Sequence, residues 1–146
     1  MTWFFYAAAA AIIWGLNYAV AGRLLERGMS PQTLFLLDMI FGTVAMAALI
    51  SFCGKWQATF SELQAVRTEM LWLIIAVFTA MVAALFIFTS IQAKNATVAS
   101  LIEVTYPFFT AFFAWLLFRQ NTLNGATLLG GLLILVGVVI IARGNR

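Results

Sequence analysis

Long runs of apolar residues, separated by short polar connections, account for most of the chain. Five runs reach the roughly 20 residues that a helix needs to cross the hydrocarbon core of a bilayer. They lie at residues 3–22, 33–52, 70–92, 96–118 and 123–142. Because a spanning segment must satisfy its own backbone hydrogen bonds, runs of this length predict helices. The pattern therefore predicts an all-α integral membrane protein with five transmembrane helices.

Polar residues at the ends of these runs support the count of five. Ser30 precedes Pro31 at the start of the second run. This order is typical of a helix N-cap followed by proline in the first turn, where the missing N–H costs nothing. Asn95 and Thr122 stand in the equivalent position before the fourth and fifth runs, and we expect each to cap its helix.

One connection, at residues 53–69, is long enough to do more than turn the chain. Within it, residues 61–64 (Ser-Glu-Leu-Gln) fit a capping box that would start a helix. Trp56, Phe60 and Leu63 would then be available to lie on the membrane surface. A plain solvated loop fits this segment equally well.

The composition agrees with a membrane protein and excludes several other classes. Hydrophobic residues make up 64% of the chain and charged residues 9%, with no histidine and one cysteine. Mean hydropathy is +1.04. These residues offer no metal-ligand cluster, so we expect neither an enzyme nor a metal or cofactor. The net charge of +3 comes from basic residues scattered among the connections, so they indicate membrane topology rather than nucleic-acid binding.

The distribution of basic residues between the two membrane faces is nearly balanced. The N-terminal face carries Lys55, Arg67 and Arg119. The opposite face carries Arg23, Arg27, Lys94, Arg143 and Arg146. A positive-inside rule would place the C-terminus in the cytoplasm, but three against five is a weak bias. Two interpretations stay open: insertion in both orientations, which is known as dual topology, and insertion in one fixed orientation.

Two carboxylic acids, Asp38 and Glu103, lie inside the apolar runs, where a charge is costly and usually functional. Each lies eight residues beyond its helix cap, Ser30 or Asn95, which places it roughly 12 Å inside the membrane. Asp38 has a structural alternative, an ion pair with a basic residue reaching in from the same face. Glu103 has no basic partner in the core of any run, so we expect it to be protonated at rest or to face a wet cavity.

Helical spacing extends the polar character of the fourth run. Ser100, Glu103, Pro107 and Thr110 recur at intervals of three, four and three, so a continuous helix would present them on one face. We expect this face to line a cavity. Pro107 removes one backbone hydrogen bond and would kink the helix.

Other runs carry residues suited to close packing or to ligand contact. Trp14 and Asn17 share a face of the first run and offer stacking and hydrogen bonding, although both also fit simple packing between helices. Gly130, Gly131 and Gly137 in the last run let another helix approach, either within the chain or in a second copy.

The order of these motifs resembles a known family. Residues 95–107 read Asn-Ala-Thr-Val-Ala-Ser-Leu-Ile-Glu-Val-Thr-Tyr-Pro, and residues 130–137 read Gly-Gly-Leu-Leu-Ile-Leu-Val-Gly. With Trp-Gly-Leu-Asn at residues 14–17 and the Ser30-Pro31 pair, they are similar to an EamA-type repeat of the drug/metabolite transporter superfamily. The resemblance covers nearly the whole chain.

The resemblance implies an architecture. Typical members have ten spans, built from two five-helix repeats in inverted orientation. It implies that residues 1–146 form a single EamA-like five-helix domain, one repeat of such a transporter. The nearly balanced charges then favour an antiparallel homodimer. The spacing of Gly130 and Gly137 also resembles the dimerisation helix of the small multidrug-resistance proteins, although the first run here lacks the glutamate of those proteins.

The resemblance also implies a function. We expect a transporter of small metabolites or drugs, most simply an exporter of amino acids or related amphipathic compounds, in a prokaryotic inner membrane. It would work by alternating access and could be proton-coupled. Glu103 and Asp38 would meet a proton or a substrate amine, Asn17 would give a polar contact, and Trp14 and Tyr106 would stack on the substrate.

Two features depart from the family pattern and two alternatives stay open. Asp38 stands where members often have a basic residue, and Arg119-Gln120 stands where a glutamate is common. The alternatives to a dimeric transporter are a non-transporting membrane subunit or scaffold, and one half of a ten-span protein.

Overall fold

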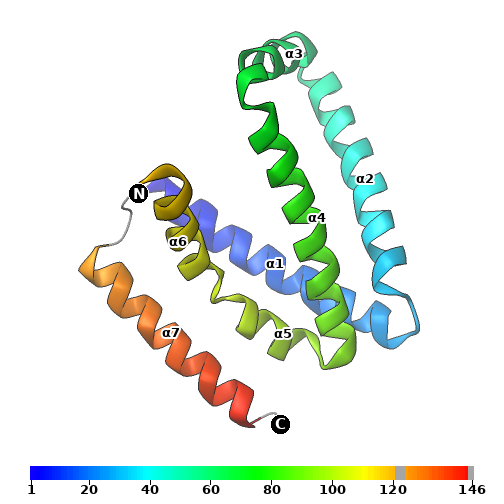
Figure 1. The fold of residues 1–146 in the computed structure, drawn as a ribbon. Coiled ribbons are helices and arrows are strands. Elements are labelled where there is room, and N and C mark those ends of the chain that lie inside the picture. Colours follow the sequence, from blue (N-terminus) through cyan, green and yellow to red (C-terminus); the bar gives the residue numbers. More distant parts are fainter. Residues whose placement is uncertain (121–123, 145–146) are drawn as a thin grey trace. The chain divides into compact units, whose positions relative to one another are not determined.

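The computed structural model describes residues 1–120 and 124–144, and its described part consists of helices joined by short connections (Figure 1). The helices are α1 (Thr2–Glu26), α2 (Pro31–Phe52), α3 (Trp56–Ala65), the 3₁₀ turn η1 (Arg67–Glu69), α4 (Met70–Ala93), α5 (Ala96–Glu103), α6 (Tyr106–Phe118) and α7 (Gly125–Gly144).

Five segments of the described chain are long and apolar enough to cross a membrane. They are Thr2–Glu26, Pro31–Phe52, Arg67–Ala93, Ala96–Phe118 and Gly125–Gly144. The predicted all-α membrane fold with five spans is therefore confirmed. Leu123, the first residue of the predicted fifth span, and its expected cap Thr122 lie outside the described residues.

The helices divide between two compact units. The first unit comprises Met1–Gly22 and Ser90–Arg146, and so contains most of α1 together with α5, α6 and α7. The second comprises Arg23–Thr89, which includes α2, α3, η1 and most of α4. Within the second unit, α2 and α4 form a hairpin whose far end is closed by α3 (Figure 1).

Side-chain caps fix the beginnings of three helices. Ser30 Oγ accepts a hydrogen bond from the Thr33 amide at 3.1 Å, and Asn95 Oδ1 accepts one from the Val98 amide at 2.8 Å. These two caps were predicted and are confirmed. For α7 the cap is Asn124, whose Oδ1 accepts from the amide of the residue three positions later at 2.8 Å.

The predicted capping box at residues 61–64 is wrong. The helix in this connection begins earlier, at Trp56, so residues 61–64 lie in its interior. The Ser61 hydroxyl donates to the Ala58 carbonyl at 2.8 Å and is not available as a cap. A helix already propagating from Trp56 adds one hydrogen bond per residue and needs no second nucleus.

The fourth span is two helices rather than one. α5 ends at Glu103 and α6 begins at Tyr106. Across the break the chain tightens: the Thr105 amide donates to the carbonyl three residues back, Ile102, at 3.2 Å, and the Phe108 amide donates to Thr105 at 3.1 Å. Pro107 lies in the first turn of α6, where it needs no hydrogen-bond partner. The expected kink is thus present as a break.

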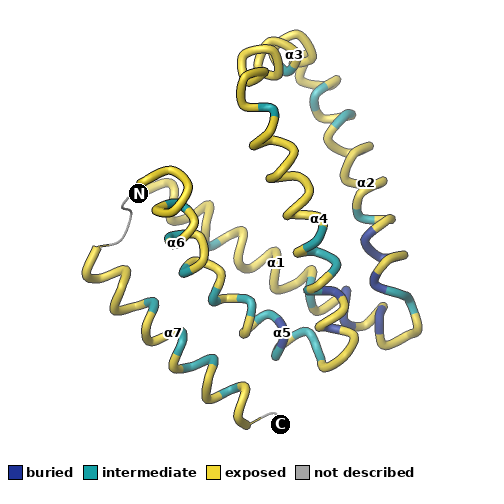
Figure 2. Tube along the Cα trace, viewed as in Figure 1, coloured by how far each residue is buried: buried dark blue, intermediate teal, exposed yellow. Residues whose placement is uncertain are grey.

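Few residues are buried, as Figure 2 shows. The buried apolar residues are Ala21, Leu25, Leu34, Phe35, Phe88, Ile91 and Ala99. In the second unit, the rings of Phe35 and Phe88 are 6.5 Å apart and join α2 to α4. Most other apolar side chains of the spans are exposed, which in a bilayer leaves them to face lipid or another helix.

Candidate functional site

The carboxylate of Glu103 meets a phenol from another helix of the same unit. The Tyr18 hydroxyl on α1 donates a hydrogen bond to Glu103 Oε2 at the end of α5, with a distance of 2.8 Å between the oxygens. The two residues are 85 positions apart in the sequence, and both are half-buried. A polar pair of this kind inside spanning helices marks the strongest candidate site in the described part of the chain.

A glycine on α1 explains why these helices come close. A Cβ added to Gly22 would lie 3.2 Å from the Ala96 Cβ in the first turn of α5. Gly22 and Tyr18 are four residues apart and therefore share one face of α1. The small surface at Gly22 brings α1 against α5, and the phenol one turn earlier reaches Glu103.

Trp14 extends this face by one more turn. Its ring lies 5.5 Å from the ring of Tyr18, with an interplanar angle of 41°. Trp14 is 56% exposed, so its surface remains available to a ligand or another helix. The predicted site residues Trp14 and Glu103 are therefore linked through Tyr18, which is not among the predicted site residues.

Tyr106 begins α6, three residues after Glu103, and its side chain is 63% exposed. A carboxylate with a phenol donor and exposed aromatic rings can bind a proton or an organic cation, because a charge at the carboxylate is neutralised while the rings cover apolar parts of the ligand.

The helix break places the Glu103 backbone in an unusual environment. Pro107 has no N–H, so it cannot donate the helical hydrogen bond to the carbonyl four residues earlier, which belongs to Glu103. Glu103 is also the last residue of α5, where the helix dipole carries partial negative charge. Side chain and backbone at this point together favour a positively charged ligand.

The predicted polar face of the fourth span is divided by the break. Ser100 and Glu103 lie on α5, whereas Pro107 and Thr110 lie on α6, so the four residues do not belong to one continuous helix. The two hydroxyls bond locally: Ser100 donates to the Thr97 carbonyl at 3.1 Å and Thr110 to the Tyr106 carbonyl at 3.1 Å. The tightened turn before Pro107 changes the helical register on which the prediction relied.

The remaining predicted polar residues, Asp38 and Asn17, are not members of this pair. Asp38 is half-buried in the middle of α2 and belongs to the second unit. Its common depth with Glu103 stays a prediction. Asn17 on α1 is exposed, beside Tyr18 in sequence but about 100° around the helix from it.

The glycines of α7 fall into two groups. A Cβ added to Gly131 would lie 2.5 Å from Phe108 Cζ, so this glycine leaves room for the Phe108 ring of α6 against α7. A Cβ at Gly130 or Gly137 would meet nothing within 4 Å. These two glycines share a face, seven residues apart, and that face remains open to another helix.

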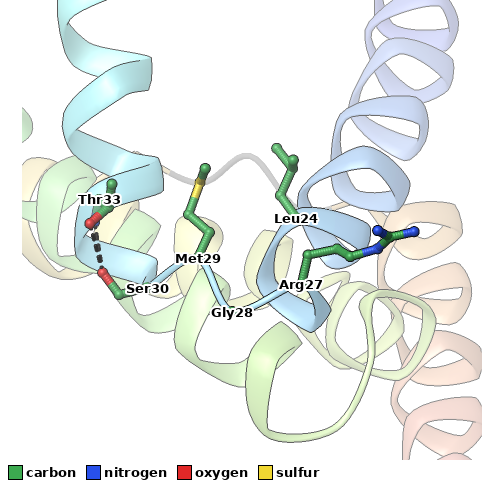
Figure 3. Close-up of a pocket in the computed structure, with 6 residues that line it drawn as sticks. All are labelled: Leu24, Arg27, Gly28, Met29, Ser30 and Thr33. Carbon is green, nitrogen blue, oxygen red and sulfur yellow. Dashed lines mark hydrogen bonds between the residues drawn. The ribbon is translucent and has the colours of Figure 1, made fainter.

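A shallow cavity of about 490 Å³ lies elsewhere, at the turn between α1 and α2 in the second unit. Its lining includes Arg27, Ser30 and Thr33. Figure 3 shows the hydroxyls of Ser30 and Thr33 turned toward each other, 2.9 Å apart, and the Arg27 guanidinium extended away from them. These hydroxyls serve the cap of α2, so the cavity has no converging polar groups.

Comparison with known proteins identifies one family. The model of the EamA-like transporter family matches residues 1–143. No curated protein and no solved structure gives a significant match to the chain. The match spans all five membrane segments, including the α1 and α5 positions that carry Tyr18 and Glu103.

Proposed function

Because the chain belongs to the EamA-like transporter family, we propose that it exports small amphipathic metabolites or drugs, with amino acids and related amines as the leading substrate class. The membrane would be the inner membrane of a prokaryote. The observation that carries the proposal is the hydrogen bond between Tyr18 and Glu103 at a helix break within a span.

In this proposal Glu103 is the group that the substrate and the proton share. A substrate ammonium would pair with the carboxylate and compete with the Tyr18 hydroxyl for it. Trp14 and Tyr106 would stack on the apolar part of the substrate. When the substrate leaves, a proton would take its place, so that export is coupled to proton entry. Asn17 and Asp38 would add polar contacts along the path.

We further propose that residues 1–146 form one five-helix domain that pairs with a second copy in antiparallel orientation. The open face at Gly130 and Gly137 supports a contact with another helix. Alternating access would then arise from rocking of the two copies. Labelling of single cysteines at residues 57 and 144 in intact cells tests this arrangement. Partial labelling of both sites from outside supports it, whereas full labelling at one site and none at the other contradicts it.

The function is tested by transport into proteoliposomes. A panel of amino acids, amino-acid esters and aromatic amines is presented under an imposed pH gradient, with substrate-driven proton movement as the readout. We expect Glu103→Gln to abolish pH-dependent transport and Glu103→Asp to retain a fraction of it. Glu62→Gln, in the exposed helix α3, is the matched control and should transport like the unmodified protein. Unchanged transport and pH dependence in Glu103→Gln would refute the proposal.

A further inference from the structure

The connection between α2 and α4 forms a helix with an amphipathic arrangement that the transport site does not use. In α3, Trp56, Phe60 and Leu63 recur at intervals of four and three and so share one face. These side chains are 42%, 59% and 46% exposed. Gln57 and Ser61 lie about 100° and 140° around the helix from Trp56, so α3 presents an uncovered apolar strip beside a polar one.

The chain holds α3 close to the end of a membrane span. Gly54, in the left-handed region at φ 64°, ends α2, and the Lys55 amide donates to the Ile50 carbonyl at 3.0 Å. This pattern is a glycine C-cap that reverses the chain within one turn. Three residues separate Phe52 from Trp56, so α3 starts at most about 14 Å from the last residue of the span.

A side-chain hydrogen bond strengthens this attachment. The Trp56 indole N–H donates to Ser51 Oγ at 2.9 Å, and the Ser51 hydroxyl donates to the Ala47 carbonyl at 2.8 Å. Both acceptors lie in the last turns of α2. The indole is therefore fixed against the end of a spanning helix, at the level where tryptophan rings are enriched between headgroups and hydrocarbon.

The net charge of the connection indicates which kind of lipid surface it can bind. Residues 55–69 contain two basic and two acidic side chains, Lys55, Glu62, Arg67 and Glu69, so their net charge is zero. A segment of this kind gains little from anionic headgroups, whereas its apolar strip gains from burial among acyl chains. Trp56 holds the start of α3 at the end of α2, and η1 leads directly into the next span. Both ends of this connection therefore lie at the same membrane boundary.

We infer that α3 is an interfacial helix, with Trp56, Phe60 and Leu63 inserted into the bilayer boundary and Gln57 and Ser61 facing water. Its binding partner is the phospholipid surface itself, through apolar contact rather than charge. The inference concerns a surface outside the transport site and does not depend on the proposed function.

The test is depth-dependent quenching on the full chain. Single cysteines replace Phe60, Leu63, Gln57 or Ser61 on a Cys53→Ser background, because Cys53 is an exposed free thiol. Each variant carries a bimane label and is reconstituted into phosphatidylcholine vesicles. Brominated lipids then quench labels in the acyl region, and iodide quenches labels in water.

We expect stronger lipid quenching at positions 60 and 63 than at 57 and 61, stronger iodide quenching at 57 and 61, and labels at 60 and 63 about 5–10 Å into the boundary. Adding anionic lipid should leave the pattern unchanged. Equal quenching at all four positions overturns the inference. Protection of 60 and 63 from both quenchers also overturns it, because a protein surface would then cover the strip.

Discussion

Removing the Tyr18 hydroxyl is the sharpest perturbation that the structure offers. Tyr18→Phe keeps the ring, and with it the contact to Trp14, but deletes the donor that bonds Glu103 at 2.8 Å. Glu103→Ala removes the acceptor. Together with the double variant, these proteins form a thermodynamic cycle that isolates the interaction between the two side chains.

The expected magnitude follows from the geometry. Hydrogen bonds between membrane helices contribute on average about 0.6 kcal/mol and at most about 1.7 kcal/mol in such cycles. The Tyr18–Glu103 bond is short, and a carboxylate is a stronger acceptor than a neutral group. We therefore expect a coupling free energy near the upper end, about 1–1.7 kcal/mol, which is about 5- to 20-fold in the unfolding equilibrium constant.

The assay is reversible unfolding in mixed detergent micelles, followed by far-ultraviolet circular dichroism. Tyr6→Phe is the matched control, because Tyr6 lies on the same helix and is 78% exposed. It should change the free energy of unfolding by no more than about 0.5 kcal/mol. If Tyr18→Phe costs no more than Tyr6→Phe, or the cycle gives a coupling within about 0.3 kcal/mol of zero, the assignment of Tyr18 as the partner of Glu103 is wrong.

Two further predictions concern the same unit of the protein and use the same unfolding assay on monomeric protein. Gly131→Ala should be less stable than the neighbouring Gly130→Ala by about 1 kcal/mol, because a Cβ at position 131 would lie 2.5 Å from Phe108 Cζ and the ring must move, whereas a Cβ at position 130 meets open space. An equal effect of the two substitutions would contradict the packing of α6 on α7. Arg119 ends α6 in the left-handed region at φ 56°, so Arg119→Gly should be more stable than Arg119→Ala by about 1 kcal/mol. Both variants lose the arginine side chain, so equal stabilities would argue against the left-handed cap.

The spans and two of the caps could be predicted from sequence because they depend on local chemistry. Length and hydropathy alone identify a spanning helix, because a single segment can satisfy its backbone hydrogen bonds in hydrocarbon only as a helix. The side chains of Ser30 and Asn95 accept hydrogen bonds from amides three residues later, so a short stretch of sequence is enough to predict these caps. The motif at residues 61–64 predicts a helix start that is too late, because a helix can begin before a capping motif. Here the helix begins at Trp56, whose indole is hydrogen-bonded to the end of α2.

Tyr18 could not be selected in the same way. Its role depends on a residue 85 positions away, and single-residue reasoning favoured its neighbour Asn17, whose amide is the more polar group. One signal was present in the sequence: Gly22 lies one turn beyond Tyr18 on the same face, and a small residue there indicates which side of α1 another helix approaches. The face that contains the glycine, rather than the most polar side chain, identifies the contact.

The divided fourth span shows where helical periodicity stops being a guide. Counting in steps of three and four assumes one register from Ser100 to Thr110, but Pro107 cannot complete the turn that contains Glu103. The chain responds before the proline, at residues 104–105, since this places Pro107 in the first turn of a new helix where its ring fits. The regular helical register is therefore interrupted between Glu103 and Pro107. A proline four residues after a carboxylate is thus better interpreted as a sign that the carboxylate lies at a helix end, where its backbone carbonyl and side chain can both face a ligand.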